Sequence, residues 1–323
     1  MKNQHLVERQ KWFVNQRLGM FIHFNSATFQ FADTEIMDWE FGHENNDEPR
    51  KYVFNPKDWN PDKLDCSQWA KAAKSAGMTF ASFTAKHHEG FSLWPSQYTE
   101  HSVRNASNTT DVVKEYLDAF RKEGIQAGLY FSMLDLHHQI NKNKCTPEDK
   151  QFIKNQIREL LTGYGEIPFL IIDGWNAEWG GPYYKDLPFE EIDQLVKELQ
   201  PDCLLMNIGC DDLAHTDIVF YENAHGQEIA DSFSGPGASC NILTNKTWFW
   251  RTTDPDMELK SVEWVLDKIN DSSNHNVSFI LNGSPNQSGL LDDNMLARYK
   301  EIGERYQRPA DLEVLPENWL YRA

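Results

Sequence analysis

The sequence has few basic residues for its length and no long apolar run. Its 323 residues include 31 lysines and arginines against 49 aspartates and glutamates, a formal net charge of −18. An excess of negative charge argues against binding to a nucleic acid backbone or to an anionic membrane surface. No apolar run in the sequence approaches the roughly 20 residues needed to cross a bilayer. We therefore expect neither nucleic acid nor a membrane as a partner.

Cysteines are few, and none stands in a CxxC pair. The five thiols are odd in number and scattered, at Cys66, Cys145, Cys203, Cys210 and Cys240. Such a set is typical of free thiols in a reducing compartment. The first residues, MKNQHLVERQKWF, contain no apolar stretch of the kind found in secretory signals. The expected location is the cytoplasm.

Apolar and aromatic residues, by contrast, are plentiful. Hydrophobic residues make up 40% of the chain and aromatic residues 13%, which is enough for a large core and excludes a disordered chain. Eight short apolar runs are predicted as strands, most of them buried on both faces as in a parallel sheet. They cover residues 20–24, 80–88, 127–134, 169–174, 203–209, 217–224, 247–251 and 277–283.

Amphipathic segments with helix signals lie between most of these runs. The clearest begins at Thr146-Pro147, where a capping residue precedes a first-turn proline. Only the connections after the fifth and sixth strands lack a long helix. The alternation of strand and helix predicts a (β/α)8 barrel over residues 1–310, irregular in its second half, with 311–323 as a C-terminal tail and no β-sandwich domain. A doubly wound sheet is the alternative fold, but no Gly-rich phosphate loop follows any strand.

Polar residues collect where the predicted strands end, which in a barrel is the end that carries the chemistry. Asp173 closes the apolar run PFLII and is followed by Gly174, and Glu222 closes DIVFY. Each carboxylate also has a structural interpretation, since Asp173 could cap the next segment and Glu222 could pair with a lysine. Two carboxylates at one rim favour glycoside hydrolysis, in which one attacks the sugar and the other protonates the leaving oxygen.

A metal-dependent hydrolase is the alternative chemistry, because imidazole ligands are available at His23, His87, His88, His137 and His138. However, a His-x-His pair on the first strand would need a second histidine where Asn25 stands. Adjacent His87 and His88 also cannot both face inward if the strand continues through them. We therefore expect no metal ion and no cofactor.

A set of longer segments narrows the interpretation. They are WFVNQRLGMFIHF, MDWEFG, FNPKDWNPDKLDCSQWAKAAKSAGM, FTAKHHEGFSLWPSQYTEHSV, GIQAGLYFSMLD, LIIDGWNAEWGG and NVSFILNGSPNQSGLL. In order and spacing they resemble the α-L-fucosidases of glycoside hydrolase family 29, from about residue 12 to about residue 307. The stretch KHHEGFSLWPS is the most specific of them.

The resemblance implies roles for individual residues. Asp173 matches the family's nucleophile and Glu222 the candidate acid/base, with Glu228 in reserve. The corresponding sugar-binding residues are His23, Asp38, Trp39, His87, His88, Trp94 and Trp248. Trp94 also has a structural interpretation, as a core residue.

Three positions depart from the family's pattern. Ile171 stands where an aromatic residue is usual, Asp38 (or Glu40) where a glutamate pairs with the loop tryptophan, and no arginine follows Asn207. These changes affect the sugar pocket rather than the catalytic carboxylates. The expected function is therefore a retaining exo-α-L-fucosidase acting on fucosylated glycans. An α-L-galactosidase and an inactive sugar-binding barrel are the alternatives, and the sequence leaves open whether the chain forms a homo-oligomer.

Overall fold

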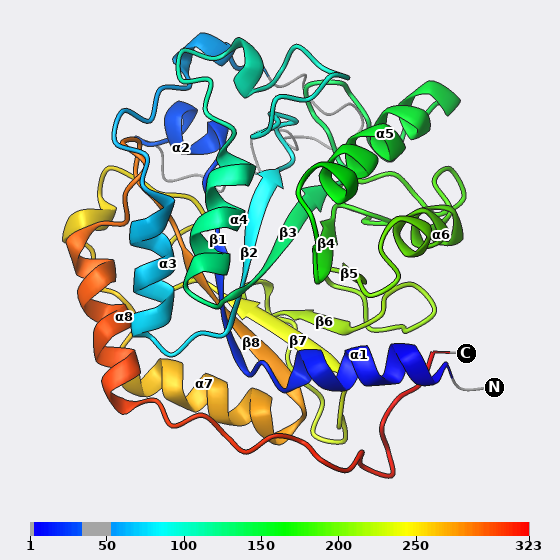
Figure 1. The fold of residues 1–323 in the computed structure, drawn as a ribbon, viewed down its shortest axis with the longest axis vertical. Coiled ribbons are helices and arrows are strands. Elements are labelled where there is room, and N and C mark those ends of the chain that lie inside the picture. The colour runs from blue at the N-terminus through cyan, green and yellow to red at the C-terminus, as the bar shows by residue number, and fades with distance from the viewer. Residues whose placement is uncertain (1–2, 34–52, 323) are drawn as a thin grey trace.

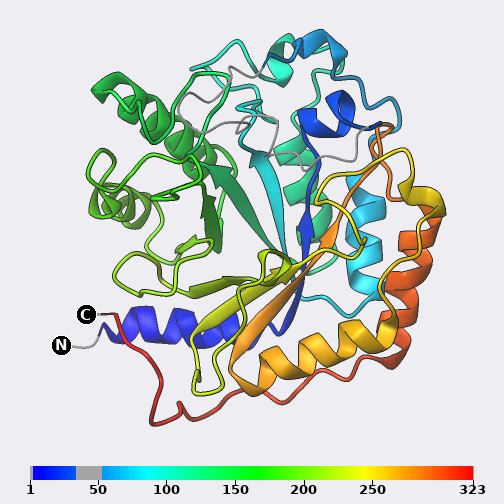
Figure 2. The ribbon, with the colours of Figure 1, turned by 180° about the vertical axis from the view of Figure 1, so that it is seen from behind.

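The computed structural model describes residues 3–33 and 53–322, and it confirms the (β/α)8 barrel (Figure 1). Eight parallel strands form one sheet in the order β5-β4-β3-β2-β1-β8-β7-β6. The strands are β1 (Leu18–Ile22), β2 (Phe80–Lys86), β3 (Gln126–Ser132), β4 (Phe169–Asp173), β5 (Leu204–Asn207), β6 (Val219–Glu222), β7 (Gly237–Asn241) and β8 (Val277–Gly283). Helices surround the sheet, as the view from behind also shows (Figure 2).

The α-helices lie around the sheet, and one of them begins at the Thr146-Pro147 signal noted in the sequence. They are α1 (Gln4–Val14), α2 (Ser26–Gln30), α3 (Cys66–Ser75), α4 (Val112–Lys122), α5 (Pro147–Gly163), α6 (Phe189–Leu199), α7 (Val262–Asn274) and α8 (Asp293–Arg305). Thr146 and Asp149 form the reciprocal capping box of α5. The connections from β5 to β6 and from β6 to β7 hold no α-helix, as expected. Among the described residues, no helix combines the length and the apolar character that spanning a membrane requires.

The sequence places the seventh strand wrongly. The predicted run at 247–251 is a loop, and β7 is instead Gly237–Asn241, with the sequence GASCN. These small residues have no strand propensity that a pattern could detect. The structure needs the glycine there, because a Cβ on Gly237 would lie 2.6 Å from a methyl carbon of Val277 on β8. The apolar side chains of 247–251 are buried above the barrel instead.

Aromatic rings fill the floor of the barrel. Phe13 of α1 packs edge-on against Phe80 of β2 and Phe169 of β4, with ring centroids 5.2 and 5.6 Å apart. Glycines on neighbouring strands make room for these rings, since a Cβ on Gly19 or Gly128 would lie within 2.5 or 2.2 Å of them. The floor is therefore closed, and the opposite end of the barrel is left for a site.

Side chains alternate along each strand, so residues two or four positions apart both point into the barrel. Phe169 points into the barrel, so Asp173, four residues later on the same strand, points to the same side. On β3 the residues Gly128 and Tyr130 share this inward face. A nucleophile candidate at the end of β4 is thus aimed into the barrel mouth by strand geometry alone.

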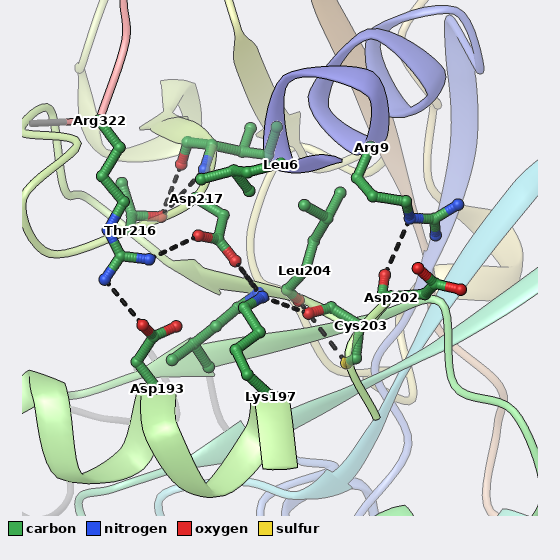
Figure 3. Close-up of polar contacts among 12 residues, drawn as sticks. Leu6, Arg9, Asp193, Lys197, Asp202, Cys203, Leu204, Thr216, Asp217 and Arg322 are labelled. Atoms are coloured by element: carbon green, nitrogen blue, oxygen red, sulfur yellow. Dashed lines mark hydrogen bonds and ion pairs between the residues drawn. The ribbon is translucent and has the colours of Figure 1, made fainter. Parts of the chain in front are cut away.

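Backbone and side-chain hydrogen bonds together hold the seam between β5 and β6, and Figure 3 shows the side chains around Asp217. These two strands are the edges of the sheet. Asp217 Oδ2 accepts a hydrogen bond from the Leu205 backbone N–H at 2.7 Å, and Thr216 Oγ1 accepts one from Asn207 at 3.0 Å. Side-chain oxygens therefore satisfy donors of β5 that a neighbouring strand would otherwise pair.

Two cations neutralise the buried Asp217. Lys197 of α6 lies 2.6 Å from its Oδ2, and Arg322 lies 2.9 Å from its Oδ1 while also pairing with Asp193 at 2.8 Å. Arg322 belongs to the C-terminal tail, which crosses the amino ends of the strands and ends beside α1 (Figures 1 and 2). The tail thus helps to hold β6, the strand that carries Glu222.

We expect Asp217→Ala to lower the free energy of unfolding by about 3 to 5 kcal/mol, because it leaves two partly buried cations without their shared carboxylate. The measurement is denaturant unfolding of the variant beside Asp118→Ala, which removes an exposed carboxylate of α4. The control should change stability by less than about 0.5 kcal/mol. Equal stability of the two variants would show that the seam does not depend on Asp217.

Candidate active site

A cavity of about 650 Å³ opens at the carboxyl ends of the strands. Residues at or just beyond the ends of the strands line it, together with the loop after β7. They include His23, His87, His88, Tyr130, Asp173, Asn207, Glu222, Cys240 and Trp248. Both candidate catalytic carboxylates therefore line the same cavity.

Asp173 is held by donors on both of its oxygens. The Tyr130 hydroxyl donates to Oδ2 at 2.7 Å and the Gly174 backbone N–H donates to Oδ1 at 2.6 Å, while His88 Nε2 lies 3.6 Å from Oδ2. Burial raises the pKa of Asp173, whereas the Tyr130 hydrogen bond, His87 and the Gly174 amide act in the opposite direction. These donors fix the carboxylate in one orientation and favour its ionised form.

Glu222 lies in a different environment. Burial, and after it the negative charge of Asp173, raise the pKa of Glu222 well above its usual value. Its Oε1 lies 3.3 Å from His225 Nε2. Two nearby carboxyl groups with unlike surroundings are the pattern of an acid and a base working together. Burial raises the pKa of both carboxyls, but only Asp173 has hydrogen-bond donors that oppose the rise, which suits Asp173 to the nucleophile's role and Glu222 to the acid's.

His23 forms one wall of the cavity. Its ring is stacked on Trp248, with centroids 4.8 Å apart and an interplanar angle of 26°, and its Nδ1 lies 3.0 Å from Asn282 Nδ2. Burial, with a smaller contribution from His87, lowers the pKa of His23 well below its usual value. A neutral imidazole beside an indole suits hydrogen bonding and stacking on a sugar.

His87 and His88 both reach the cavity, because β2 ends at Lys86 and the chain turns there. His87 Nδ1 lies 2.8 Å from Glu89 Oε2, and its ring is nearly parallel to that of Tyr130. His88 Nδ1 lies 2.6 Å from the Ser132 hydroxyl. The objection that adjacent histidines cannot both face inward therefore does not apply.

The other site residues predicted from the sequence fall in different places. Trp248 lines the cavity. Trp94 does not: it is 2% exposed, and its indole N–H donates to Glu159 of α5 at 2.8 Å, which places it in the core. Glu228 is 68% exposed and lies 3.8 Å from Lys268, away from the lining. Asp38 and Trp39 lie outside the described residues.

Several lining residues escaped the sequence reasoning. Tyr130 bonds Asp173, and its inward position on β3 follows from the alternation with Gly128. Trp179 is 40% exposed, and its ring centroid lies 5.1 Å from that of His88. Tyr184 accepts a hydrogen bond from Asn207 at 2.7 Å. No pattern in the sequence signals the last two, because both come from the long loop after β4.

The histidines considered as metal ligands are not gathered at one point. The ring of His137 is stacked on His101, with centroids 3.6 Å apart, and His138 Nδ1 lies 2.9 Å from Asp135. Within residues 3–33 and 53–322, no group of three or more histidine, cysteine or acidic side chains is arranged to hold a metal ion.

Comparison with known proteins gives one consistent result. A family model described as alpha-L-fucosidase matches residues 1–308. Alpha-L-fucosidase 1 of Arabidopsis thaliana is 32% identical over 311 residues, covering 89% of this chain and 57% of that protein. This chain thus spans little more than half the length of that relative.

Solved structures of the same family have the same fold as this chain. A glycoside hydrolase 29 family member from an unknown rumen bacterium has a TM-score of 0.72 at 28% identity, covering 92% of this chain and 56% of that chain. An alpha-L-fucosidase of family 29 from Bacteroides thetaiotaomicron, a trapped covalent intermediate with 2-fluoro-fucosyl fluoride, shares the fold with a TM-score of 0.68. It is 23% identical, covering 91% of this chain and 73% of that one. Because the family model matches almost its whole length, this chain belongs to the alpha-L-fucosidase family, glycoside hydrolase family 29.

Proposed function

We propose that this protein is a retaining exo-α-L-fucosidase that hydrolyses terminal α-L-fucosyl residues of fucosylated glycans. The observation that carries the proposal is the pair of unlike carboxyl groups in one cavity. Asp173 is oriented by Tyr130 and Gly174, and burial and Asp173 raise the pKa of Glu222. Membership of the family supports the substrate class.

In the first step Asp173 attacks the anomeric carbon, and the bond to the leaving oxygen breaks. Glu222 donates its proton to that oxygen, so the leaving group departs as an alcohol. Once Asp173 is esterified it carries no charge, and the pKa of Glu222 falls because one of the two causes of its rise has gone. The covalent intermediate trapped in the Bacteroides thetaiotaomicron enzyme is the kind of species that this step would form.

In the second step Glu222, now a carboxylate, takes a proton from water. The water oxygen attacks the anomeric carbon and releases Asp173, which returns to its ionised form between Tyr130 and Gly174. Each attack inverts the anomeric carbon, so two attacks restore the α configuration. His23, His87, His88 and Trp248 surround the space in which the sugar would bind.

The first test is hydrolysis of p-nitrophenyl α-L-fucoside followed by proton NMR. We expect nitrophenol release, with α-L-fucose as the first anomer to appear before mutarotation. The matching α-L-galactoside serves as the comparison, because it differs from the fucoside only by a hydroxyl group on C6. Faster cleavage of the galactoside would identify an α-L-galactosidase instead. A β-anomer appearing first would contradict the double displacement.

We also propose a reducing, cytoplasmic location. All five cysteines are free thiols, and three of them, Cys66, Cys203 and Cys240, are buried. Burial raises the pKa of each of these three thiols, which keeps them in the unreactive protonated form. Cell fractionation with an antibody against the chain tests this location.

A further inference from the structure

The short turn after β6 brings a histidine back onto Glu222. Residues Asn223–His225 form one turn of 3-10 helix, and Gly226 ends it with φ of +83°, a value that favours glycine. Gln227 fixes the turn, since its Oε1 accepts a hydrogen bond from the Glu222 backbone N–H at 2.8 Å. In this conformation His225 Nε2 lies 3.3 Å from Glu222 Oε1.

The same ring nitrogen faces a second group. The indole N–H of Trp248 points at His225 Nε2 from 3.5 Å. An indole nitrogen can only donate, so His225 Nε2 must present its lone pair and carry no hydrogen. The imidazole is then neutral, with its hydrogen on Nδ1.

This tautomer determines the nature of the contact with Glu222. A bare Nε2 and a carboxylate would repel each other, whereas a protonated carboxyl can donate its hydrogen to Nε2. The electrostatics agree independently, because burial and Asp173 favour the protonated form of Glu222. The one lone pair of His225 Nε2 would then be shared between the hydrogens of Trp248 and Glu222, in a three-centre contact.

We propose that His225 is a positioning residue that accepts a hydrogen bond from the Glu222 carboxyl and holds this acid oriented and protonated before catalysis. The inference rests on the proposed function, in which Glu222 is the acid/base. Trp248 keeps the histidine in its acceptor form, and the ring of Trp248 is itself fixed by stacking on His23. His225 gains and loses no proton in the cycle, since the proton passes from Glu222 to the leaving oxygen and returns to Glu222 from water.

The sign of the expected pH effect depends on all groups around Glu222. Among residues 3–33 and 53–322, the titratable neighbours of Glu222 include Asp173 of β4, Tyr130 of β3, Cys240 of β7 and His225 itself. Burial raises the pKa of Tyr130 and of Cys240 well above their usual values, so both stay neutral. A hydrogen bond that accepts from the neutral carboxyl raises the pKa of Glu222, so removing the acceptor should lower it.

The experiment compares His225→Leu with His225→Gln. The two replacements have similar volumes, but only glutamine offers an oxygen that can accept from Glu222. For His225→Leu we expect the basic limb of the kcat/KM profile to move to lower pH by about one unit. We also expect poor leaving groups to lose about tenfold more rate than nitrophenol, because only poor ones need the proton. His225→Gln should restore most of both effects, and His5→Leu, an exposed histidine of α1, is the unrelated control.

The results distinguish an acceptor role for His225 from a merely structural role and from a cationic one. A merely structural histidine would lower both substrates equally and leave the basic limb in place. A cationic His225 would give a basic limb that moves to higher pH in His225→Leu, since a positive neighbour favours ionised Glu222. Either result overturns the proposal.

A second measurement does not depend on activity. Nitrogen-15 NMR of the histidine rings, with His225 assigned by its absence in His225→Gln, should show hydrogen on Nδ1 and none on Nε2. A doubly protonated ring, or hydrogen on Nε2, would contradict the inference. If the unaltered protein fails to cleave fucosides while the ring shows the expected tautomer, the proposed function fails and the contact with Glu222 stands.

Discussion

Replacing Asp173 with alanine should lower kcat for p-nitrophenyl α-L-fucoside by about four orders of magnitude or more, because the covalent route loses its nucleophile. The unfolding midpoint should stay nearly unchanged. Asp173 lies at the end of β4 and the barrel floor is built by other residues, Phe13, Phe80 and Phe169. Thermal unfolding and steady-state kinetics on the same preparation measure both quantities.

Azide separates loss of the nucleophile from general damage to the site. A small anion can occupy the space of the missing carboxylate and attack the anomeric carbon once, which yields the β-L-fucosyl azide. Asp118→Ala, on the outer face of α4, is the matched control and should keep full activity. Retention of more than about one per cent of the rate by Asp173→Ala would remove Asp173 from the nucleophile's role.

Glu222→Gln should have the second largest effect, and its size should depend on the leaving group. Substrates with poor leaving groups need the proton that Glu222 donates, so they should lose about 10²- to 10⁴-fold in kcat/KM. Nitrophenyl fucoside needs little protonation and should lose far less in its first step. Its second step should become slow without the base, so a burst of nitrophenol should precede a low steady rate, and azide should raise that rate.

The pH profile gives an independent check on the same residue. Glu222 acts as an acid only while protonated, so activity should fall as pH rises through its pKa, which burial and Asp173 raise. Asp173 attacks only when ionised, so activity should fall at the acid end as its carboxylate takes up a proton. Glu222→Gln should abolish the basic limb, whereas Glu228→Gln, an exposed side chain paired with Lys268, should leave the profile intact. The reverse result would transfer the acid/base role to Glu228.

The barrel architecture and the positions of the two catalytic carboxylates follow from local sequence. Continuous apolar runs such as PFLII can be buried on both faces only in a sheet covered by helices, and the helix signals between them supply that cover. Asp173 was predictable because a carboxylate that ends such a run, next to a glycine, is at the mouth of a barrel. Glu222 follows the same logic on β6. In these cases the chemistry of a few consecutive residues determines the position.

The tertiary structure decided the remaining features. β7 has no strand-forming side chains, and it is a strand because its backbone pairs with β6 and β8, with a glycine where Val277 leaves no room for a Cβ. Trp94 was expected at the sugar and lies in the core, where Glu159 of α5, 65 residues away, accepts its indole hydrogen. The contact of Trp248 with His225 likewise joins two loops that no periodicity connects. Hydrogen-bond partners distant in sequence are chosen by packing, and packing becomes defined only when the barrel closes.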